Sequence, residues 1–449
     1  MNMIIKPVAI LAAMLAVSPV AQPKLDPMDN WGQWRGPMGT GVAPHAVPPV
    51  HWSETQNIRW KVAVGGLGHS SPIVWGDHIF LTTARPVGQP VATGFPHRPG
   101  EHDNVAPRRM QKFIVLALDR RSGAMVWEKT MLTARPHEGM HETASWASAS
   151  PVTDGEVVVA SFGSRGVFGL SMTGDLLWQV DLGDMQTKHG HGEGSSPALY
   201  GDTVVVNWDQ EANSFLVAID KRTGSVKWHV HRDEPTSWSS PIIVEVEGKP
   251  QVIVSATNRV RGYDLQTGET IWECGGLSGN VVATPVSAKG IVYAANSYDT
   301  QAMLAIRLVG ARGDVTGSDS VVWTRNRYTP YVPSPVLYDD ALCFLRHYQG
   351  YLTCVDARNG RTQFGPVRLN GITNVYASLV GAAGRIYIAD RRGTTQVVKR
   401  DAPFRVVATN RLDDSFSASP AIVGKELFLR GARSLYCIAE DGPKSEPAN

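Results

Sequence analysis

The stretch ALDRRSGAMVW (117–127) recurs along this chain as AIDKRTGSVKW (218–228) and GYDLQTGETIW (262–272). In every copy an Asp is followed four residues later by Gly and eight residues later by Trp. An Asp that bonds turn amides and a Gly that accepts positive φ are typical of a tight turn between two strands. The stretch GLSMTGDLLW (169–178) is a shortened copy, and CVDARNGRTQF (354–364) is a degenerate one. The chain is therefore predicted to repeat one strand–turn–strand unit.

A second phrase precedes these units, and SSPIVWGDHIFLTTA (70–84) is its clearest copy. Alternating apolar residues broken by a Gly/Asp turn predict a β-hairpin. The phrase has eight anchors, at Pro72, Pro151, Pro197, Pro241, Pro285, Pro335, Leu379 and Pro420. Most anchors are 41 to 50 residues apart, which is the period of a propeller blade. The predicted fold is all-β, an eight-bladed β-propeller of four-stranded antiparallel blades.

The two ends of the repeat predict how the ring closes. The last blade ends with a third strand, Ser434 to Ala439, and NIRWKV (57–62) is typical of a lone fourth strand. We therefore expect Ile58 to Val62 to complete the last blade, which removes exposed sheet edges. The first anchor gap is longer because of an insertion at 85–111. A long loop of this kind is either disordered or binds a partner.

The Asp, Gly and Trp of the first phrase look functional only when one copy is considered alone. Because they recur at the same place in successive blades, we interpret them as structural, with each Trp stacked between neighbouring blades. The residues of this predicted docking motif are Asp119, Gly123, Trp127, Asp220, Gly224, Trp228, Asp264, Gly268 and Trp272.

The segments before the anchors carry the residues that do not repeat. Each segment is expected to cross from an outer strand to the channel, so their side chains should meet at one channel mouth. The candidate ligand or partner site consists of His69, His141, Glu142, Trp146, His189, His191, Glu193 and Trp238. Other blades place Asn280, Tyr331, Tyr376 and Phe416 at the same position. No catalytic residue is predicted.

Two interpretations fit the His-rich crossings. His189 and His191 are two residues apart in HGHGEG (189–194) and, with His141 and a carboxylate, could hold a divalent metal. Alternatively, these histidines satisfy loop backbone groups around the channel. Because the spacing matches no known metal motif, we prefer the second interpretation and predict no metal site.

Composition and charge exclude several classes of function. The chain has 449 residues and a formal net charge of +2, so it has no general electrostatic attraction for nucleic acid. Motifs of nucleophilic hydrolases and of phosphate-binding loops are missing from the sequence. Among the four cysteines, Cys343 and Cys354 flank a predicted hairpin turn symmetrically. They either form a disulfide or are two buried free thiols.

The N-terminus has the pattern of an export signal. Lys6 precedes an apolar stretch at 7–17, which is too short to span a bilayer as a mature helix. We expect a signal peptide at 1–22, an N-terminal extension at 23–56, the propeller at 57–440 and a tail at 441–449. With no cysteine near the expected cleavage site to carry a lipid, the protein is predicted to be periplasmic or secreted.

The docking motif resembles that of the PQQ-like β-propeller repeat, and residues 30 to 440 resemble the exported BamB-like or PQQ-binding-like propellers. WGQWRGP (31–37), WSETQNIRW (52–60) and LYCIA (435–439) resemble a planctomycete-type branch of that group. One fold of this kind hosts unrelated functions.

The resemblance implies two functions. Non-catalytic relatives such as BamB present loops to protein partners, whereas quinoprotein dehydrogenases oxidise alcohols or sugars with PQQ and calcium. Those enzymes resemble one another in a vicinal Cys–Cys pair, a Trp floor and calcium ligands from Glu, Asn and Asp. This chain has no adjacent cysteines. We therefore predict a monomeric, non-catalytic binding or scaffold protein with envelope or secreted protein partners. A PQQ-dependent dehydrogenase is the alternative.

Overall fold

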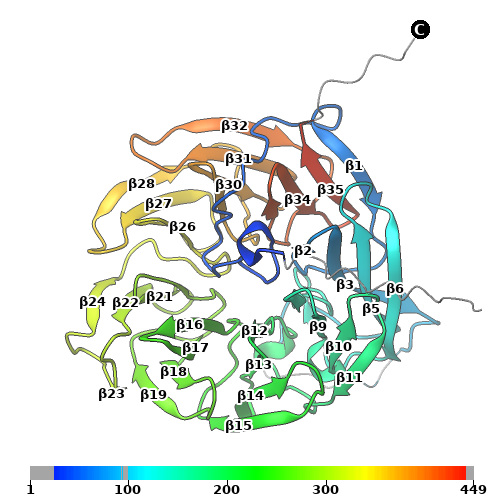
Figure 1. Ribbon diagram of the computed structural model, residues 1–449, viewed down its shortest axis with the longest axis horizontal. Helices are drawn as coiled ribbons and strands as arrows, with labels where there is room; N and C mark the ends of the chain where they lie inside the picture. The colour runs from blue at the N-terminus through cyan, green and yellow to red at the C-terminus, as the bar shows by residue number, and fades with distance from the viewer. Residues whose placement is uncertain (1–24, 93, 95–99, 441–449) are drawn as a thin grey trace, which may run out of the picture.

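Eight antiparallel sheets surround a central channel in the computed structural model of this protein (Figure 1). The structure describes residues 25–92, 94 and 100–440, so the expected signal peptide and tail lie outside the described residues. Short first strands stand at the channel, and the last strand of each sheet forms the rim (Figure 1). The predicted all-β, eight-bladed propeller is confirmed.

The blades follow one another in chain order. Blade 1 contains β2 (Ile73–Trp75), β3 (His78–Val87), β5 (Met110–Asp119) and β6 (Met125–Ala134). Blade 2 contains β8 (Val152–Thr153), β9 (Val157–Ser161), β10 (Val167–Ser171) and β11 (Leu176–Val180). Blade 3 contains β12 (Ala198–Tyr200), β13 (Thr203–Trp208), β14 (Ser214–Asp220) and β15 (Val226–Arg232), and blade 4 contains β16 (Ile242–Val246), β17 (Lys249–Ser255), β18 (Val260–Asp264) and β19 (Thr270–Cys274). Blade 5 contains β20 (Val286–Ala288), β21 (Ile291–Asn296), β22 (Ala302–Arg307) and β24 (Val321–Arg325); blade 6 contains β25 (Val336–Tyr338), β26 (Ala341–Leu345), β27 (Tyr351–Asp356) and β28 (Thr362–Arg368); blade 7 contains β29 (Val380–Ala382), β30 (Arg385–Ala389), β31 (Thr394–Lys399) and β32 (Val406–Arg411); blade 8 contains β33 (Ala421–Val423), β34 (Glu426–Arg430), β35 (Ser434–Ala439) and β1 (Ile58–Ala63).

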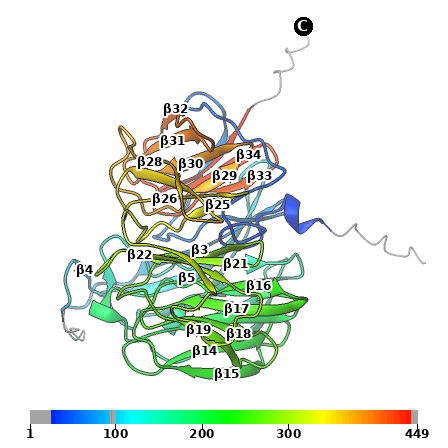
Figure 2. The same ribbon diagram turned by 90° about the vertical axis from the view of Figure 1, so that its left-hand side faces the viewer.

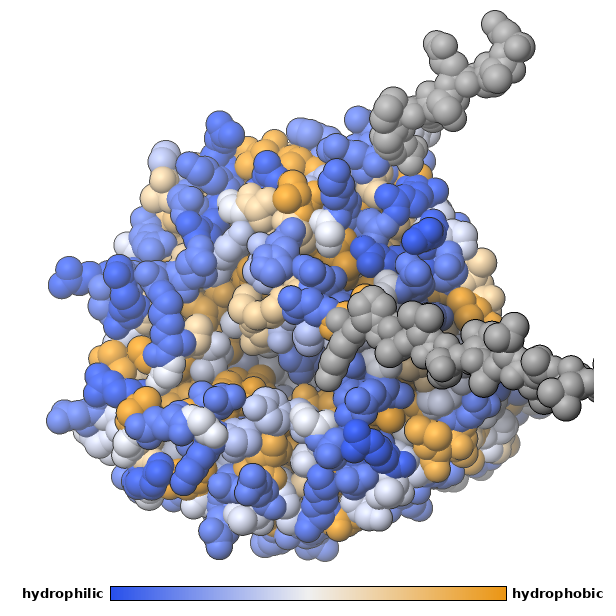
Figure 3. Space-filling view, in the orientation of Figure 1, coloured by the Kyte–Doolittle hydropathy of each residue, from blue (hydrophilic) through white to orange (hydrophobic). Residues whose placement is uncertain are grey.

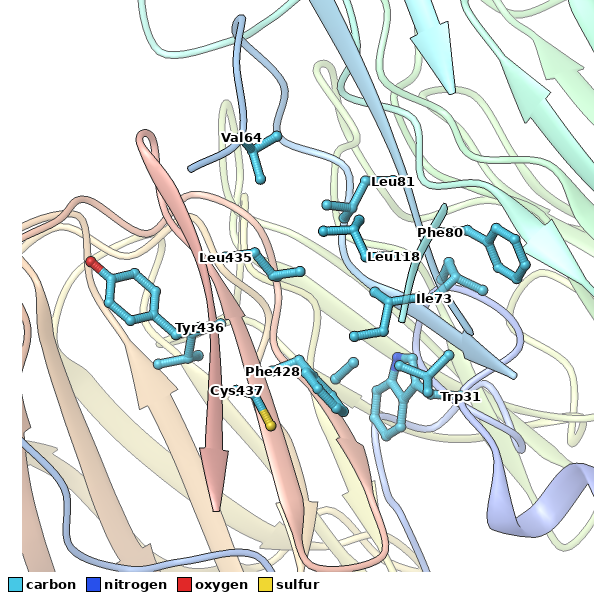
Figure 4. Packing of buried hydrophobic residues seen from close by; sticks show 14 of the residues in the cluster. Trp31, Val64, Ile73, Phe80, Leu81, Leu118, Phe428, Leu435, Tyr436 and Cys437 are labelled. Carbon is cyan, nitrogen blue, oxygen red and sulfur yellow. The ribbon is translucent and has the colours of Figure 1, made fainter. Parts of the chain in front are cut away.

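The ring closes in blade 8, as the sequence predicts. Strand β1 pairs antiparallel with β35, with Trp60 opposite Cys437 and Val62 opposite Leu435. Across the seam, Ile73 and Phe80 of blade 1 belong to the same buried cluster as Phe428 of blade 8 (Figure 4). This cluster joins the first and last blades through apolar burial rather than through a free sheet edge.

At the rim, tryptophans of the docking motif or at the equivalent position join five of the eight blades to the next blade. The indole Nε1 of Trp178 donates to the carbonyl of Lys221 at 2.7 Å, and Trp228 donates to Leu265 at 2.8 Å. Gly224 has φ +74, and a Cβ there would lie 2.9 Å from the Cβ of Trp178. Only glycine therefore allows this turn to rest on the preceding blade's tryptophan. Trp60, Trp127 and Trp323 make the same bond to the following blade.

Trp272 departs from this pattern. Its Nε1 donates to Gln251 Oε1 of its own blade at 3.1 Å. The following blade has no Asp–Gly turn to supply an acceptor, because its chain makes an excursion between β22 and β24. That excursion forms β23 (Gly313–Asp314), which pairs in parallel with β19 and places Gly313 opposite Trp272. Blade 4 thereby gains a fifth strand.

A ladder of hydroxyl groups joins the blades near the channel. From blade 2 to blade 8, the residue before each anchor accepts a hydrogen bond from the amide of its counterpart one blade earlier. Ser196 N donates to Ser240 Oγ at 2.8 Å, and Ser240 N donates to Thr284 Oγ1 at 3.0 Å. The seven bonds run through Ser71, Ser150, Ser196, Ser240, Thr284, Ser334, Ser378 and Ser419. The ladder explains why a small polar residue precedes the anchor in every blade.

The N-terminal extension crosses the channel on one face of the ring. It contains the short helix η1 (Pro27–Asp29), which Figure 1 shows at the centre of the ring. Trp31 bridges to Val74 in blade 1, and Val42 bridges to Gly381 in blade 7. Between them, Arg35 is 1% exposed and donates to the carbonyls of Pro335 and Leu379 at 2.6 and 2.8 Å. On this face polar side chains cover most of the rim (Figure 3).

The insertion lies on the opposite face of the ring. Figure 2 shows η1 and β4 (Asn104–Val105) on opposite sides of the blades. Both ends of the expected insertion (85–111) lengthen a hairpin instead of forming loop, because β3 and β5 stay paired from Arg85 opposite Lys112 to Val87 opposite Met110. Strand β4 then pairs with β7 (Met140–His141), which leads into blade 2. The described part of the insertion is thus fastened beside the channel.

Candidate functional site

The channel widens into a cavity of about 590 Å³ on the insertion side of the ring. Its wall includes six of the predicted candidate residues, namely His69, His141, Glu142, His191, Glu193 and Trp238. Trp34 lines this cavity and also the groove beside the N-terminal extension. The indole of Trp34 therefore separates the two faces of the channel and forms the floor of the cavity.

Hydrogen bonds between successive crossings hold the wall in place. His69 N donates to the carbonyl of Ala147 in the next crossing at 3.1 Å, and Trp238 N donates to Val281 at 2.8 Å. The indole Nε1 of Trp238 donates to Gly192 at 2.7 Å in the preceding crossing. Because these crossings are bonded to their neighbours, side chains that are far apart in sequence keep fixed positions around this part of the mouth.

Four imidazole rings gather beside blades 2 and 3, and we name His102, His141, His189 and His191 the histidine cluster. The ring centre of His191 lies 4.8 Å from that of His102, 4.8 Å from that of His141 and 5.4 Å from that of His189. His102 and His189 are 5.3 Å apart. Within residues 25–92, 94 and 100–440, no group of three or more His, Cys, Asp or Glu side chains could hold a metal ion.

Asn104 of β4 fastens the insertion to this cluster. Its Nδ2 donates to the carbonyls of His189 and Gly190 at 2.8 and 2.9 Å, and its Oδ1 lies 2.9 Å from His191 Nδ1. The amide of His141 donates to the carbonyl of His191 at 2.9 Å. Burial lowers the pKa of His191 to about 4 and also lowers the pKa of His141. Both rings are therefore neutral near pH 7.

Glu193 is the carboxylate that burial perturbs most on this wall. Its Oε2 accepts a hydrogen bond from Ser164 N at 2.7 Å, and Oε1 accepts one from the Ser164 hydroxyl. Burial outweighs these bonds and raises the pKa of Glu193 to about 7. The group is thus poised to change charge near neutrality, although its bonds to Ser164 serve the local turn of η2 (Gly163–Arg165).

The opposite wall is aromatic and comes from blades 5 to 7. We name Tyr298, Tyr331, His347, Tyr348 and Tyr376 the tyrosine wall; all five line the cavity. Tyr331 stacks on His347 with ring centres 4.7 Å apart, and Tyr348 lies 5.9 Å from Tyr376. The guanidinium of Arg391 lies 4.9 Å from the centre of the Tyr376 ring. This contiguous surface offers π faces and phenol hydroxyls to a bound group.

Polar atoms at the same wall have no protein partner. Asn280 Oδ1, Asn374 Oδ1 and Arg391 Nε are buried and form no hydrogen bond within the described part of the chain, and all three residues line the cavity. A buried polar group without a partner costs about 1–3 kcal/mol. A ligand that supplied donors to the two amide oxygens and an acceptor to the guanidinium would recover part of that cost.

The structure also shows what the sequence prediction misplaced or missed. Trp146 lines a smaller neighbouring pocket with Glu193, and Phe416 is fully buried in the core. His189 belongs to the histidine cluster but not to the cavity wall. The additional wall residues with ionisable, aromatic or amide side chains are Trp34, His102, Asp103, Tyr298, His347, Tyr348, Asn374 and Arg391. The insertion was the only sequence signal for His102 and Asp103.

The residues present do not fit a quinone–calcium centre. Cys343 and Cys354 form a disulfide between β26 and β27, inside the core of blade 6 and away from the cavity wall. This disulfide confirms the pairing alternative, but it joins strands instead of covering a cofactor. The cavity wall includes Asp103, Glu142 and Glu193, but among the described residues no group of three or more His, Cys, Asp or Glu side chains could hold a metal ion. We therefore derive no step through PQQ or calcium.

Comparison with known proteins places the fold in one family. Residues 111–366, more than half of the chain, match the family described as outer membrane protein assembly factor BamB. The chain belongs to the BamB family. The BamB of Yersinia pestis is 23% identical over 345 residues, covering 72% of this chain and 79% of that protein. The BamB of Francisella salina is 29% identical over 104 residues, covering 23% of this chain and only 18% of its own length.

Solved structures share the fold of this BamB-family protein. The crystal structure of BamB from Moraxella catarrhalis covers 79% of this chain and all of its own, with a TM-score of 0.52 and 14% identity. The computationally designed protein Ika8 covers 76% of this chain and 98% of its own, with a TM-score of 0.53 and 13% identity. Among the described residues, no helix is long and apolar enough to cross a membrane.

Proposed function

We propose that this BamB-family propeller is a non-catalytic binding protein of the cell envelope that holds a segment of a partner protein in the channel-mouth cavity. Family membership supports the general role, because the Yersinia and Francisella relatives are named outer membrane protein assembly factors. The observation that carries the proposal is the tyrosine wall with its partnerless polar atoms, at the one mouth where the crossings converge.

The chemistry of this wall suits a protein partner. Tyr, Trp and Arg are enriched at the energetic centres of protein interfaces, where they combine a large apolar surface with a polar tip. Tyr348, Tyr376, Trp238 and Arg391 provide this combination around one cavity. The amide oxygens of Asn280 and Asn374 would accept backbone N–H groups of an inserted segment. A cavity of about 590 Å³ admits a few side chains of a loop, and Trp34 limits how far they enter.

The cellular setting belongs to the same proposal. We place the protein in the periplasm or outside the cell, after removal of a signal peptide at 1–22, with an extension at 23–56, the propeller at 57–440 and a tail at 441–449. Its partners are envelope or secreted proteins, it works as a monomer, and it belongs to a planctomycete-type branch. The near-neutral net charge of +2 supports a protein rather than a nucleic-acid partner.

A quantitative pull-down tests the proposal. Wild-type protein, a Tyr348→Ala/Tyr376→Ala variant and a Tyr200→Ala control are used as bait in envelope extract of the native host. Tyr200 lines the groove on the N-terminal-extension side and lies outside the cavity. We expect the double variant to lose at least about 90% of a partner that wild type and Tyr200→Ala retain, since one hot-spot aromatic contributes about 2 kcal/mol or more.

Two results would overturn the proposal. One is equal recovery of every partner by the double variant, after circular dichroism has shown that it is folded. The other is turnover of alcohols or sugars by the purified protein supplied with PQQ and Ca²⁺, which would establish the dehydrogenase alternative.

A further inference from the structure

We infer that the partner segment which enters the channel-mouth cavity carries a carboxylate, and that this carboxylate pairs with Arg391. The inference rests on the proposed function and names the chemistry of the partner at that same site. Arg391 lines the cavity, and its buried Nε has no hydrogen-bond partner. Among the residues that the structure describes, no Asp or Glu forms an ion pair with Arg391. A half-buried guanidinium without a counter-ion favours an anionic group from outside the chain.

The fold holds this guanidinium in position and leaves its donors free. Arg391 follows β30, and its backbone amide donates to the carbonyl of Asn374, in the crossing into blade 7, at 2.9 Å. The guanidinium lies over the ring of Tyr376, 4.9 Å from the ring centre. A guanidinium uses its face in such a contact, whereas its N–H donors point outward in its plane. The Tyr376 ring therefore positions Arg391 without satisfying its donors, and two parallel donors match the two oxygens of a carboxylate.

The acid next to Arg391 in the sequence is occupied by backbone amides. Asp390 is fully buried, and its Oδ1 accepts hydrogen bonds from the amides of Arg392 and Thr394 at 2.8 and 3.0 Å. Its Oδ2 accepts one from the amide of Thr373 at 3.3 Å. The carboxylate of Asp390 therefore stabilises the turn between β30 and β31 instead of pairing with Arg391.

A second buried cation strengthens the positive charge on this side of the cavity. Arg430 is 2% exposed, and its guanidinium donates to the hydroxyl of Ser70 and to the carbonyl of Ser70 at 3.0 Å. Both acceptors are neutral, and within the described ranges Arg430 forms no ion pair. Burial, followed by the charges of Arg430 and Arg391, lowers the pKa of His69 to about 3. Since His69 lines the cavity, both guanidinium groups act on the same part of its wall.

The carboxylates of the wall come from other elements. Asp103 belongs to the insertion and Glu142 to the crossing into blade 2, and the amide of Glu142 donates to the carbonyl of Asp103 at 2.7 Å. Glu193 lies in the crossing into blade 3, whereas Arg391 belongs to blade 7. An entering carboxylate is therefore attracted to Arg391 and repelled by Asp103 and Glu142. This contrast determines the direction in which the segment lies across the mouth.

The remaining polar atoms of the wall favour a peptide over an inorganic anion. Asn280 is 3% exposed and lines the cavity, and its Oδ1 has no partner in the part of the chain that the structure describes. The same holds for Oδ1 of Asn374. These oxygens need donors, which a peptide backbone provides in its N–H groups. An acidic residue within a peptide segment supplies both these donors and the carboxylate for Arg391.

Binding of capped heptapeptide pools on beads tests the inference. Three pools are random except at the central position, which is Glu, Gln or Lys, and a fourth pool is fully random with a free C-terminal carboxylate. We expect the Glu pool to retain about 10-fold more wild-type protein than the Gln pool, because it gains a charge-assisted hydrogen bond. Arg391→Gln should lose this preference while keeping the circular dichroism of wild type. Arg392→Gln, which removes an exposed arginine outside the cavity wall, should keep it.

The pools also distinguish the two sources of a carboxylate. Stronger retention by the fourth pool than by the Glu pool would support the inference and assign the carboxylate to a chain terminus. Equal retention by the Glu and Gln pools, stronger retention by the Lys pool, or an unchanged preference in Arg391→Gln would overturn the inference.

The pull-down from envelope extract separates this inference from the proposed function. Recovery of the partner by Arg391→Gln at the wild-type level, together with its loss by Tyr348→Ala/Tyr376→Ala, would overturn the role of Arg391 and leave the proposed function intact. Equal recovery by both variants and wild type would overturn both. Loss of the partner by both variants, with retention by Arg392→Gln, is the result that we expect.

Discussion

The rim and the channel mouth of this propeller differ in whether their residues repeat from blade to blade. At the rim and along the hydroxyl ladder, the same residue types meet the same partners in blade after blade, as with Trp178 on Gly224 and Trp228 on Gly268. At the mouth the residue types change around the ring, from histidines beside blades 1 to 3 to tyrosines beside blades 5 to 7, and some buried polar atoms have no partner within the described residues. The comparison teaches that the repeated residues stabilise the ring, whereas the residues that do not repeat are available for binding.

The largest expected loss of stability comes from the rim. Trp228→Ala removes an indole that packs on Gly268 and donates to Leu265, so the free energy of unfolding should fall by about 3–5 kcal/mol. Tyr348→Ala, a substitution of the half-buried aromatic at the mouth, serves as the matched control and should cost far less. Urea unfolding followed by tryptophan fluorescence and circular dichroism measures both. Equal decreases in the free energy of unfolding would contradict the view that the rim stabilises the ring more than the mouth does.

The next largest loss of stability is expected in the N-terminal extension, where it crosses the channel. Arg35→Ala leaves the carbonyls of Pro335 and Leu379 without their buried donor, and the free energy of unfolding should fall by about 2–4 kcal/mol. Arg35→Lys keeps a charge but cannot reach both carbonyls in a fork, so it should recover only part of the loss. The same unfolding experiment measures both variants. A fully stable Arg35→Ala protein would show that the extension is not part of the folded unit.

The mouth should also show a specific pH dependence. Burial, followed by the charges of Arg430 and Arg391, lowers the pKa of His69 to about 3, whereas the unfolded chain takes up this proton near pH 6.5. The stabilising contribution is therefore complete above about pH 6.5 and is lost as the pH falls toward 3. At pH 5 the loss should be at most about 2 kcal/mol. His69→Asn should have a shallower decline between pH 7 and pH 5, and an unchanged decline would contradict this origin.

The smallest effect is expected in the hydroxyl ladder. Ser240→Ala removes the acceptor of the Ser196 amide and should lower the free energy of unfolding by about 1 kcal/mol. Ser240→Thr keeps a hydroxyl, which blade 5 already uses at the equivalent Thr284, and should be closer to wild type. The pair of variants is compared by the midpoint of urea unfolding. If Ser240→Thr were the less stable of the two, packing and not the ladder would dominate at this position.

The blades and their order were predictable because the repeat is visible in the sequence as a regular spacing of the same residues. Anchor spacing alone indicated eight blades, and a lone strand at 57–62 indicated the closing pair of β1 and β35. Trp272 shows the limit of this reasoning. Its motif is the same as in other blades, but its hydrogen-bond partner depends on the following blade, which lacks the matching turn.

Of the residues at the mouth, those in the crossings between blades could be predicted, whereas those in the extension and the insertion could not. Placing each crossing at one mouth identified His69, His141 and His191, since their positions follow from blade topology. The contacts of Trp34 and His102 depend on how the extension and the insertion fold back on the ring. No local period encodes such long-range contacts, which involve pairs such as Arg35 with Leu379, 344 residues apart.

Site-specific photo-crosslinking from the two faces of the ring tests the central claim most directly. A photoreactive amino acid is placed at Tyr348 in the cavity or at Tyr200 beside the N-terminal extension, and the protein is irradiated in the envelope of its native host. We predict a discrete crosslinked partner from position 348 and none of comparable yield from position 200. The same partner crosslinked from position 200 alone would contradict the assignment of the cavity as the binding face.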